Sequence, residues 1–382
     1  MKLAIWVIIS LTAVSYGLVA IEYMWKDFVP SSPRIQDSLY SAVVSADFAY
    51  GHGSVSEVAG GTFSAQREVM LLHTVAGGLA LMLCVPQFMG KFRRRRPALH
   101  RRLGQSTLVL VAVSMVFGAV KLCTSPPDMS LTGSPGNTAQ LWLLWAATSG
   151  SAALAYVSAR RKDYLSHQAW MILMFSMLLT APLLRFFELM FGLVWNDVHM
   201  VEALWWGAVV LAVASTGGAA LAQQIVLPVG AEARRLSERL PDLRIVMVLT
   251  GVTGLGASFI LGFRIVNIPG FDSRLILCQL LPVAVLSIVF GVMYATKRTS
   301  LSAHRWQNAI YFCAIALVPT VVNVAMTVVE ISGVPSAEAY YISAMGAAPL
   351  PIFAGLLFFA KQRAGRHESR STSRPSTLTL TP

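Results

Sequence analysis

The chain has little charge for its length. Charged residues make up 13% of its 382 residues, whereas hydrophobic residues make up 55%. A soluble domain of this size carries more charge on its surface. The composition therefore excludes an ordinary soluble globule and predicts an integral membrane protein.

The chain also lacks the short motifs of soluble enzymes. Its four cysteines, Cys84, Cys123, Cys278 and Cys313, form no CxxC pair, so neither a zinc site nor a c-type haem site is indicated. No P-loop, GxGxxG, HExxH or GxSxG pattern occurs in the context it needs. A disulfide between Cys123 and Cys278 stays open, the alternative being lone membrane cysteines.

Long apolar runs dominate what is there. A membrane-crossing helix needs about 20 mostly apolar residues. The runs of this kind are 3–23, 69–88, 104–123, 141–159, 169–191, 203–221, 245–263, 275–296, 309–329 and 339–360. They predict an all-α, polytopic membrane bundle with about ten transmembrane helices.

The distribution of basic residues predicts the orientation. If the N-terminus is inside, the inner segments carry 23 of the 30 lysines and arginines. Such an excess is typical of the cytoplasmic side. We therefore expect both termini to be cytoplasmic, in a bacterial inner membrane with the lipid bilayer as solvent.

Five segments follow from the runs. Residues 1–24 form the first transmembrane helix, 25–68 an external loop or cap, and 69–192 a first transmembrane region. Residues 193–361 add further helices, and 362–382 form a disordered cytoplasmic tail. No segment suits nucleic acid, because the basic run GKFRRRRPALHRRLGQ lies between two spans, where it favours anionic lipid headgroups.

Two stretches resemble each other. ARRKDYLSHQAW is echoed by ATKRTSLSAHRW, and a proline follows the histidine by fifteen residues in both, giving the pairs His167 with Pro182 and His304 with Pro319. A parallel repeat of two four-helix units explains this echo, as in some transporters. Chance similarity is the alternative.

Three ionisable residues lie at membrane depth near the external side. Arg185 and Glu188 are one turn apart on one helix face, and His73 lies inside the second span. Ionisable groups at such depth point to function. We expect a ligand or substrate pocket that includes His73, Arg185 and Glu188, with contact to the interface as the alternative for Glu188.

Three further histidines lie at the cytoplasmic entrances of spans: His100, His167 and His304. Two histidines at one depth on neighbouring helices are able to ligate a b-type haem from both faces or to bind a metal. Contact with lipid headgroups is the alternative interpretation of the same positions.

Several of these residues resemble motifs of a family of prokaryotic membrane proteins of unknown function, DUF2306. The matching positions are His73 with Gly77 and Gly78, the PQF of residues 86–88, the LHR of residues 99–101 with Gly104, and His167, Trp170, Met171 and Arg185. The resemblance covers about residues 69–192. It implies a multi-pass membrane protein and no reaction.

Three functions remain open. The first is a membrane redox protein, with haem at His100 and His167 and a quinone or substrate near His73 and Arg185. The second is a small-molecule transporter. The third is a non-catalytic membrane partner or assembly factor in which the histidines are architectural. An optical spectrum, ligand-dependent stabilisation and co-purification distinguish the three.

Overall fold

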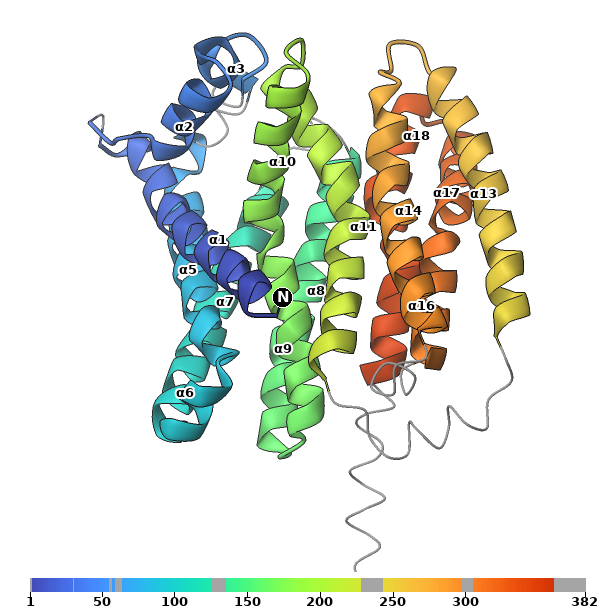
Figure 1. The fold of residues 1–382 in the computed structure, drawn as a ribbon. Coiled ribbons are helices and arrows are strands. Elements are labelled where there is room, and N and C mark those ends of the chain that lie inside the picture. The colour runs from blue at the N-terminus through green and yellow to red at the C-terminus, as the bar shows by residue number, and fades with distance from the viewer. Residues whose placement is uncertain are drawn as a thin grey trace, which may run out of the picture.

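The computed structural model describes residues 2–29, 31–54, 57–58, 64–124, 135–227, 243–296 and 305–360. All regular structure in these ranges is helical, and ten helices are long and apolar enough to cross a membrane. They stand side by side in one bundle (Figure 1). The predicted all-α polytopic fold is confirmed. The predicted tail and His304 lie outside the described residues.

The spans follow the predicted apolar runs closely. In chain order they are α1 (Lys2–Tyr23), α5 (Arg67–Gln87), α7 (Pro97–Thr124), α8 (Pro135–Arg160), α9 (Tyr164–Leu178) with α10 (Thr180–Val194), α11 (Met200–Val226), α13 (Arg244–Val266), α14 (Arg274–Ala295), α16 (Arg305–Ala316) with α17 (Val318–Ile331), and the last span from Ser336 to Ala360.

Two spans are interrupted, and proline explains both interruptions. Pro182 has no N–H to donate to the Leu178 carbonyl, so the helix breaks at Leu179 between α9 and α10. Pro319 has the same effect on the Ile315 carbonyl, and α16 gives way to α17 at Leu317. The two breaks therefore lie three and two residues before the prolines that follow the echoing stretches. The parallel repeat stays a prediction.

The last span is also irregular. It begins as α18 (Ser336–Ile342), continues as the π-helix η3 (Ser343–Ala347) and is helical again over residues 350–360. A π-helical turn is rare and is frequent at functional sites. The irregular turn lies midway along this span.

Helix α11 occupies the centre of the bundle, between the N-terminal helices and the C-terminal ones (Figure 1). Its small residues allow this close packing. A side chain at Gly207 would collide with Leu184, and one at Gly217 with Leu286. Helix α11 thus joins α10 on one side to α14 on the other.

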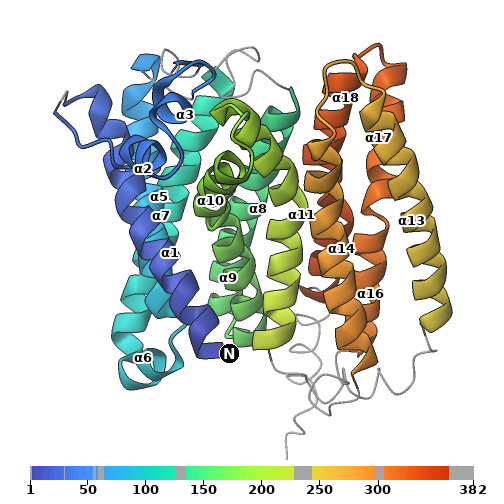
Figure 2. The same ribbon diagram turned by 45° about the horizontal axis from the view of Figure 1, so that its top comes forward.

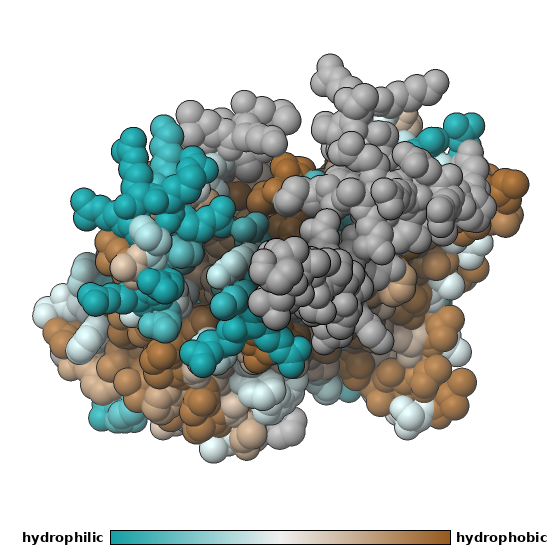
Figure 3. Space-filling model, turned by 90° about the horizontal axis from the view of Figure 1, so that it is seen from below, coloured by the Kyte–Doolittle hydropathy of each residue, from teal (hydrophilic) through white to brown (hydrophobic). Residues whose placement is uncertain are grey.

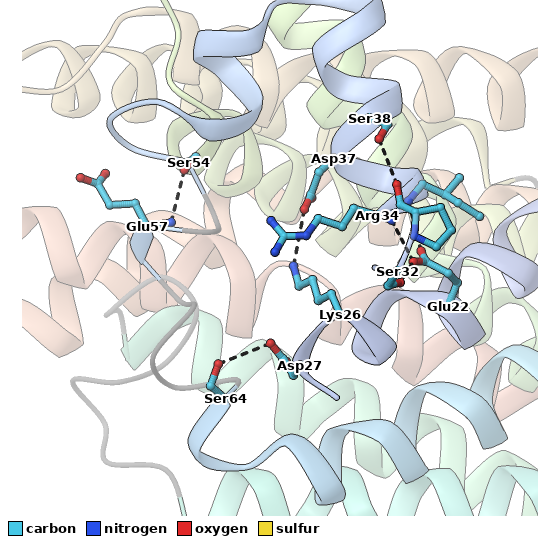
Figure 4. A network of polar contacts seen from close by, with 12 residues as sticks. Glu22, Lys26, Asp27, Ser32, Arg34, Asp37, Ser38, Ser54, Glu57 and Ser64 are labelled. Carbon is cyan, nitrogen blue, oxygen red and sulfur yellow. Dashed lines mark hydrogen bonds and ion pairs between the residues drawn. The ribbon is translucent and has the colours of Figure 1, made fainter. Parts of the chain in front are cut away.

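A small cap closes one end of the N-terminal helices. It consists of η1 (Met24–Asp27), α2 (Ile35–Val43) and α3 (Ala46–Tyr50). Figure 2 tilts this end, with α2 and α3, toward the viewer. The Glu22 carboxylate accepts hydrogen bonds from the Ser32 hydroxyl and the Arg34 amide, and Lys26 pairs with Asp37 at 3.6 Å (Figure 4). These contacts hold α2 over the bundle. We call this the cap end.

The opposite end carries the short helix α6 (Gly90–Arg95), which folds against the start of α7. We call it the basic end, because the basic run identified in the sequence lies there. All four cysteines are free, so the disulfide between Cys123 and Cys278 is not formed.

Candidate functional site

A cavity of about 290 Å³ lies between the spans, toward the cap end. Its walls come from α1, α2, α5, α8, α9, α10, α11 and the last span, and most of its lining is aliphatic or aromatic. A smaller polar set includes Tyr16, Gln36, His73, Asn137, Gln140 and Arg185. An apolar cavity with a few convergent polar groups is the usual form of a small-molecule site.

Arg185 and Glu188 form an ion pair within α10, as their spacing predicts. Arg185 Nη1 donates to Glu188 Oε1 at 2.6 Å, and the Glu188 side chain is fully buried. Arg185 lines the cavity, whereas Glu188 is absent from its lining and lies behind Arg185 as the counter-ion. The structure therefore brings His73 and Arg185 to one cavity and gives Glu188 a supporting position.

Tyr40 of the cap completes this pair. Its hydroxyl donates to Glu188 Oε2 at 2.5 Å. Burial, and then the nearby Glu188 carboxylate, raise the pKa of Tyr40 well above its usual value, so the hydroxyl keeps its proton and remains a donor. A neutral residue from α2 thus fixes the charged pair of α10.

His73 is held in one tautomer by α7. Its Nδ1 lies 2.8 Å from the Ser114 carbonyl oxygen, and the Ser114 hydroxyl donates to the His73 carbonyl. Because a carbonyl oxygen only accepts, Nδ1 carries the hydrogen of the neutral ring. The lone pair is then on Nε2, and His73 brings a hydrogen-bond acceptor to the cavity wall.

Gln36 contributes an unused donor. It is only 5% exposed and lines the cavity, yet its Nε2 has no hydrogen-bond partner. Buried polar groups are nearly always paired, and an orphan calls for an explanation. A ligand oxygen in the cavity would supply the missing acceptor.

Both irregular stretches of nearby spans reach this cavity. Thr180 and Ala181, just beyond the break at Leu179, line one wall, and Met345 of η3 lines another. Interrupted helices surround substrate sites in many transporters. The cavity is therefore bounded by the least regular backbone of these two spans.

Gln87 determines the tautomer of His100 at the basic end. The His100 carbonyl only accepts and the Gly104 amide only donates, so the Gln87 amide must place its nitrogen toward His100 and its oxygen toward Gly104. That nitrogen donates to His100 Nδ1 at 2.9 Å. The neutral His100 ring therefore carries its hydrogen on Nε2.

His167 has the opposite tautomer. Its Nδ1 donates to the Ala155 carbonyl at 2.9 Å, which leaves a lone pair on Nε2. His100 and His167 are close enough to interact electrostatically. A haem ligand needs the lone pair of Nε2, so His167 fits this role and His100 does not while Gln87 holds it.

No metal centre is evident in the part of the chain that the structure describes. No group of three or more histidine, cysteine, aspartate or glutamate side chains there is arranged to hold a metal ion. These residues therefore offer no third ligand for a metal ion held by His100 and His167.

Sequence reasoning did not identify Gln36 and Tyr40. Both lie on the buried face of α2, four residues apart, in the segment IQDSLYSAV. That helical spacing was a usable signal for a buried polar face. Their contact with α10 and the cavity is tertiary, and no local pattern reports it.

The helices define a multi-pass α-helical membrane protein with a largely apolar cavity between its spans. Residues 70–217 match the model of the DUF2306 family, which is described as a predicted membrane protein. The resemblance is thus confirmed, and the match continues past residue 192 through most of α11. No curated protein and no solved structure matches the chain.

The matched segment supplies only part of the cavity. His73, Gln140, Arg185 and the α11 wall lie within it. Gln36 of the cap and Met345 and Phe353 of the last span lie outside it. Elements beyond the family match therefore complete the cavity.

Proposed function

We propose that the chain is a redox-linked membrane protein that binds a quinone-class molecule in the cap-end cavity. The observation that carries this proposal is the neutral polar end of an otherwise apolar cavity. The charge of Arg185 is offset by Glu188 at 2.6 Å, and His73 is held as an acceptor rather than a cation. A neutral, lipid-soluble ligand suits such a site better than an anion does.

The polar groups also match the functional groups of a quinone. A carbonyl oxygen would accept from Gln36 Nε2 or from the Arg185 guanidinium, which also hydrogen-bonds Tyr16 and whose Nη1 donates to Glu188. The hydroxyl of the reduced form would donate to His73 Nε2. The site thus offers partners to both redox forms of the ligand.

Haem enters this proposal only as a candidate redox cofactor. His167 presents the lone pair that an axial ligand needs, whereas Gln87 gives His100 the wrong tautomer. We therefore assign no step to haem. The optical spectrum of protein from haem-replete cells tests the point: a Soret band abolished by His100→Ala would contradict the tautomer argument.

Quinone binding is tested on the purified protein in nanodiscs with ubiquinone-1 as the probe. We expect saturable stabilisation against thermal unfolding, weakened at least tenfold by His73→Phe and by Arg185→Lys. Arg264→Lys is a matched control, because Arg264 pairs with Glu330 between α13 and α17 and does not line the cavity. Lysine keeps the charge in both variants but loses the planar donor geometry.

The competing outcome is specific. If decanoate, an anionic amphiphile, stabilises the protein through Arg185 and ubiquinone-1 does not, the ligand is an acid and the quinone proposal fails. Equal loss of binding in Arg185→Lys and Arg264→Lys would also contradict it, because a general structural effect then accounts for the result.

Small-molecule transport is the second candidate, favoured by the proline interruptions in two spans. Broken spans of this kind form the substrate sites of many transporters. Uptake of a cavity ligand into proteoliposomes, abolished by Arg185→Lys, would support transport over redox chemistry. Binding without uptake would favour the first proposal.

We infer that the basic end faces the cytoplasm of a bacterial inner membrane. The excess of lysine and arginine at this end supports the orientation. Cys123 is exposed near the cap end, whereas Cys84 and Cys278 are buried. A membrane-impermeant maleimide added to spheroplasts should therefore label Cys123, and protection of Cys123 would reverse the topology.

A further inference from the structure

Helix α6 and the first turns of α7 form a cationic hairpin at the basic end. Its seven cationic side chains are all exposed: Lys91, Arg93, Arg94, Arg95, Arg96, Arg101 and Arg102. Figure 3 shows hydrophilic side chains gathered on the left of this face, beneath the N-terminal helices. No acidic residue occurs between Gly90 and Thr124, so this hairpin contains no counter-charge of its own.

His100 lies half-buried within the hairpin. Phe92 of α6 packs edge-on against its ring at 6.4 Å, and Arg93 is close enough to interact with it electrostatically. Gln87 occupies Nδ1, so the ring presents its Nε2–H. Within the described part of the chain, His100 Nε2 has no hydrogen-bond partner.

We propose that this hairpin is a specific site for the phosphate of an anionic phospholipid, with His100 Nε2–H and the Arg93 guanidinium as its donors. The other cations raise the local concentration of anionic lipid but do not define the site. Nearby His167 does not compete for the phosphate, because its Nε2 is an acceptor. The inference is independent of the ligand in the cap-end cavity.

The surroundings favour a lipid over a soluble phosphate or a nucleic acid. Met89 is 46% exposed and Leu99 is 38% exposed, so apolar side chains flank the cations where α5 ends and α7 begins. An apolar and cationic boundary fits the junction between acyl chains and headgroups. A free phosphate or an oligonucleotide would leave these apolar side chains in water.

The proposal differs measurably from diffuse attraction to an anionic membrane. Because the imidazole of His100 is neutral, His100→Leu removes a donor without changing the net charge of the protein, so diffuse attraction predicts no effect. A specific site predicts about a tenfold loss, the size expected for a hydrogen bond to a charged group. His52→Leu is the matched control, because His52 is an exposed histidine at the cap end.

Native mass spectrometry of the full chain, released from mixed phosphatidylglycerol and phosphatidylcholine nanodiscs, provides the assay. We expect one tightly retained phosphatidylglycerol, a roughly tenfold weaker retention in His100→Leu and Arg93→Gln, and wild-type retention in His52→Leu. Gln87→Leu frees Nδ1 and should weaken retention less than His100→Leu, because the ring can still donate.

Several outcomes overturn the proposal. Equal lipid retention by His100→Leu and the wild type would mean that diffuse electrostatic attraction alone holds the lipid. Displacement of the lipid by millimolar inorganic phosphate would indicate a soluble ligand, and displacement by a short oligonucleotide would indicate a nucleic acid. If His100→Leu does not fold, a comparison of Arg93→Gln with Arg95→Gln decides, because each variant removes one exposed positive charge of α6 and only Arg93 is assigned to the site; equal retention by the two variants would overturn the proposal.

Discussion

Tyr40→Phe isolates the contribution of the cap to the charged pair in α10. The substitution removes only the hydroxyl that donates to Glu188 Oε2 at 2.5 Å. The ring keeps its place, because it packs edge-on against Phe48 with centroids 6.0 Å apart. Any effect of the substitution therefore reports the loss of the hydroxyl, which donates chiefly to Glu188 Oε2 and has a second, longer contact of 3.4 Å with the Arg185 carbonyl.

The size of the effect follows from the burial of Glu188. Its side chain is fully buried, so water cannot replace the lost donor. A hydrogen bond to a charged group contributes about 2 kcal/mol to stability. For a large domain this corresponds to a fall of roughly 4 °C in melting temperature.

Thermal unfolding in nanodiscs, followed by thiol-reactive fluorescence at the buried cysteines, measures the change. Tyr50→Phe is the control, because Tyr50 is a 47% exposed tyrosine of the same cap. We also expect weaker ubiquinone-1 binding in Tyr40→Phe, since Arg185 loses a fixed counter-ion. An unchanged melting temperature and unchanged binding would refute the role of Tyr40.

The other predictions concern neighbouring parts of the molecule. Glu188→Gln leaves Arg185 buried without its counter-ion and should cost about 3–5 kcal/mol in thermal unfolding, with Glu330→Gln, which is 28% exposed, costing less. Gly118→Leu should displace the His73 ring, since even a Cβ there would lie 3.2 Å from its Nδ1, and should weaken ubiquinone-1 binding without loss of folding; unchanged binding would contradict this. The side-chain hydrogen bond from Arg274 lowers the pKa of Asp272, so its stabilising effect is present above about pH 4 and is lost as the pH falls through the depressed value. Asp272→Asn should therefore reduce the loss of melting temperature between pH 5 and pH 3, and an unchanged acid profile would contradict this pairing.

The spans were predictable because membrane helices leave a direct signal in the sequence. Apolar length places α5 and α14 within a few residues of their observed bounds. The helical spacing of Arg185 and Glu188 likewise predicted their shared face, on which the structure shows an ion pair. In both cases the information is local to one helix.

The remaining features depend on contacts between distant segments. Tyr40 meets Glu188 across 148 positions of the chain, and no spacing rule connects α2 to α10. The tautomer of His100 depends on the orientation of the Gln87 amide in a different helix. The sequence singled out His73, His100 and His167 as candidate site residues. Only the packing shows which ring nitrogen of each histidine is free to bind a ligand.

The walls of the cavity come partly from the family-matched segment and partly from helices outside it, and this division has an evolutionary consequence. His73 and Arg185, the groups proposed to bind the ligand, belong to the family-matched segment, whereas Met345 and Phe353 come from the last span beyond it. Substitution in the last span can reshape the apolar part while the polar end is retained. We therefore expect relatives that share the matched segment but differ in their C-terminal helices to keep one headgroup chemistry and diversify in the length and bulk of the tail they accept.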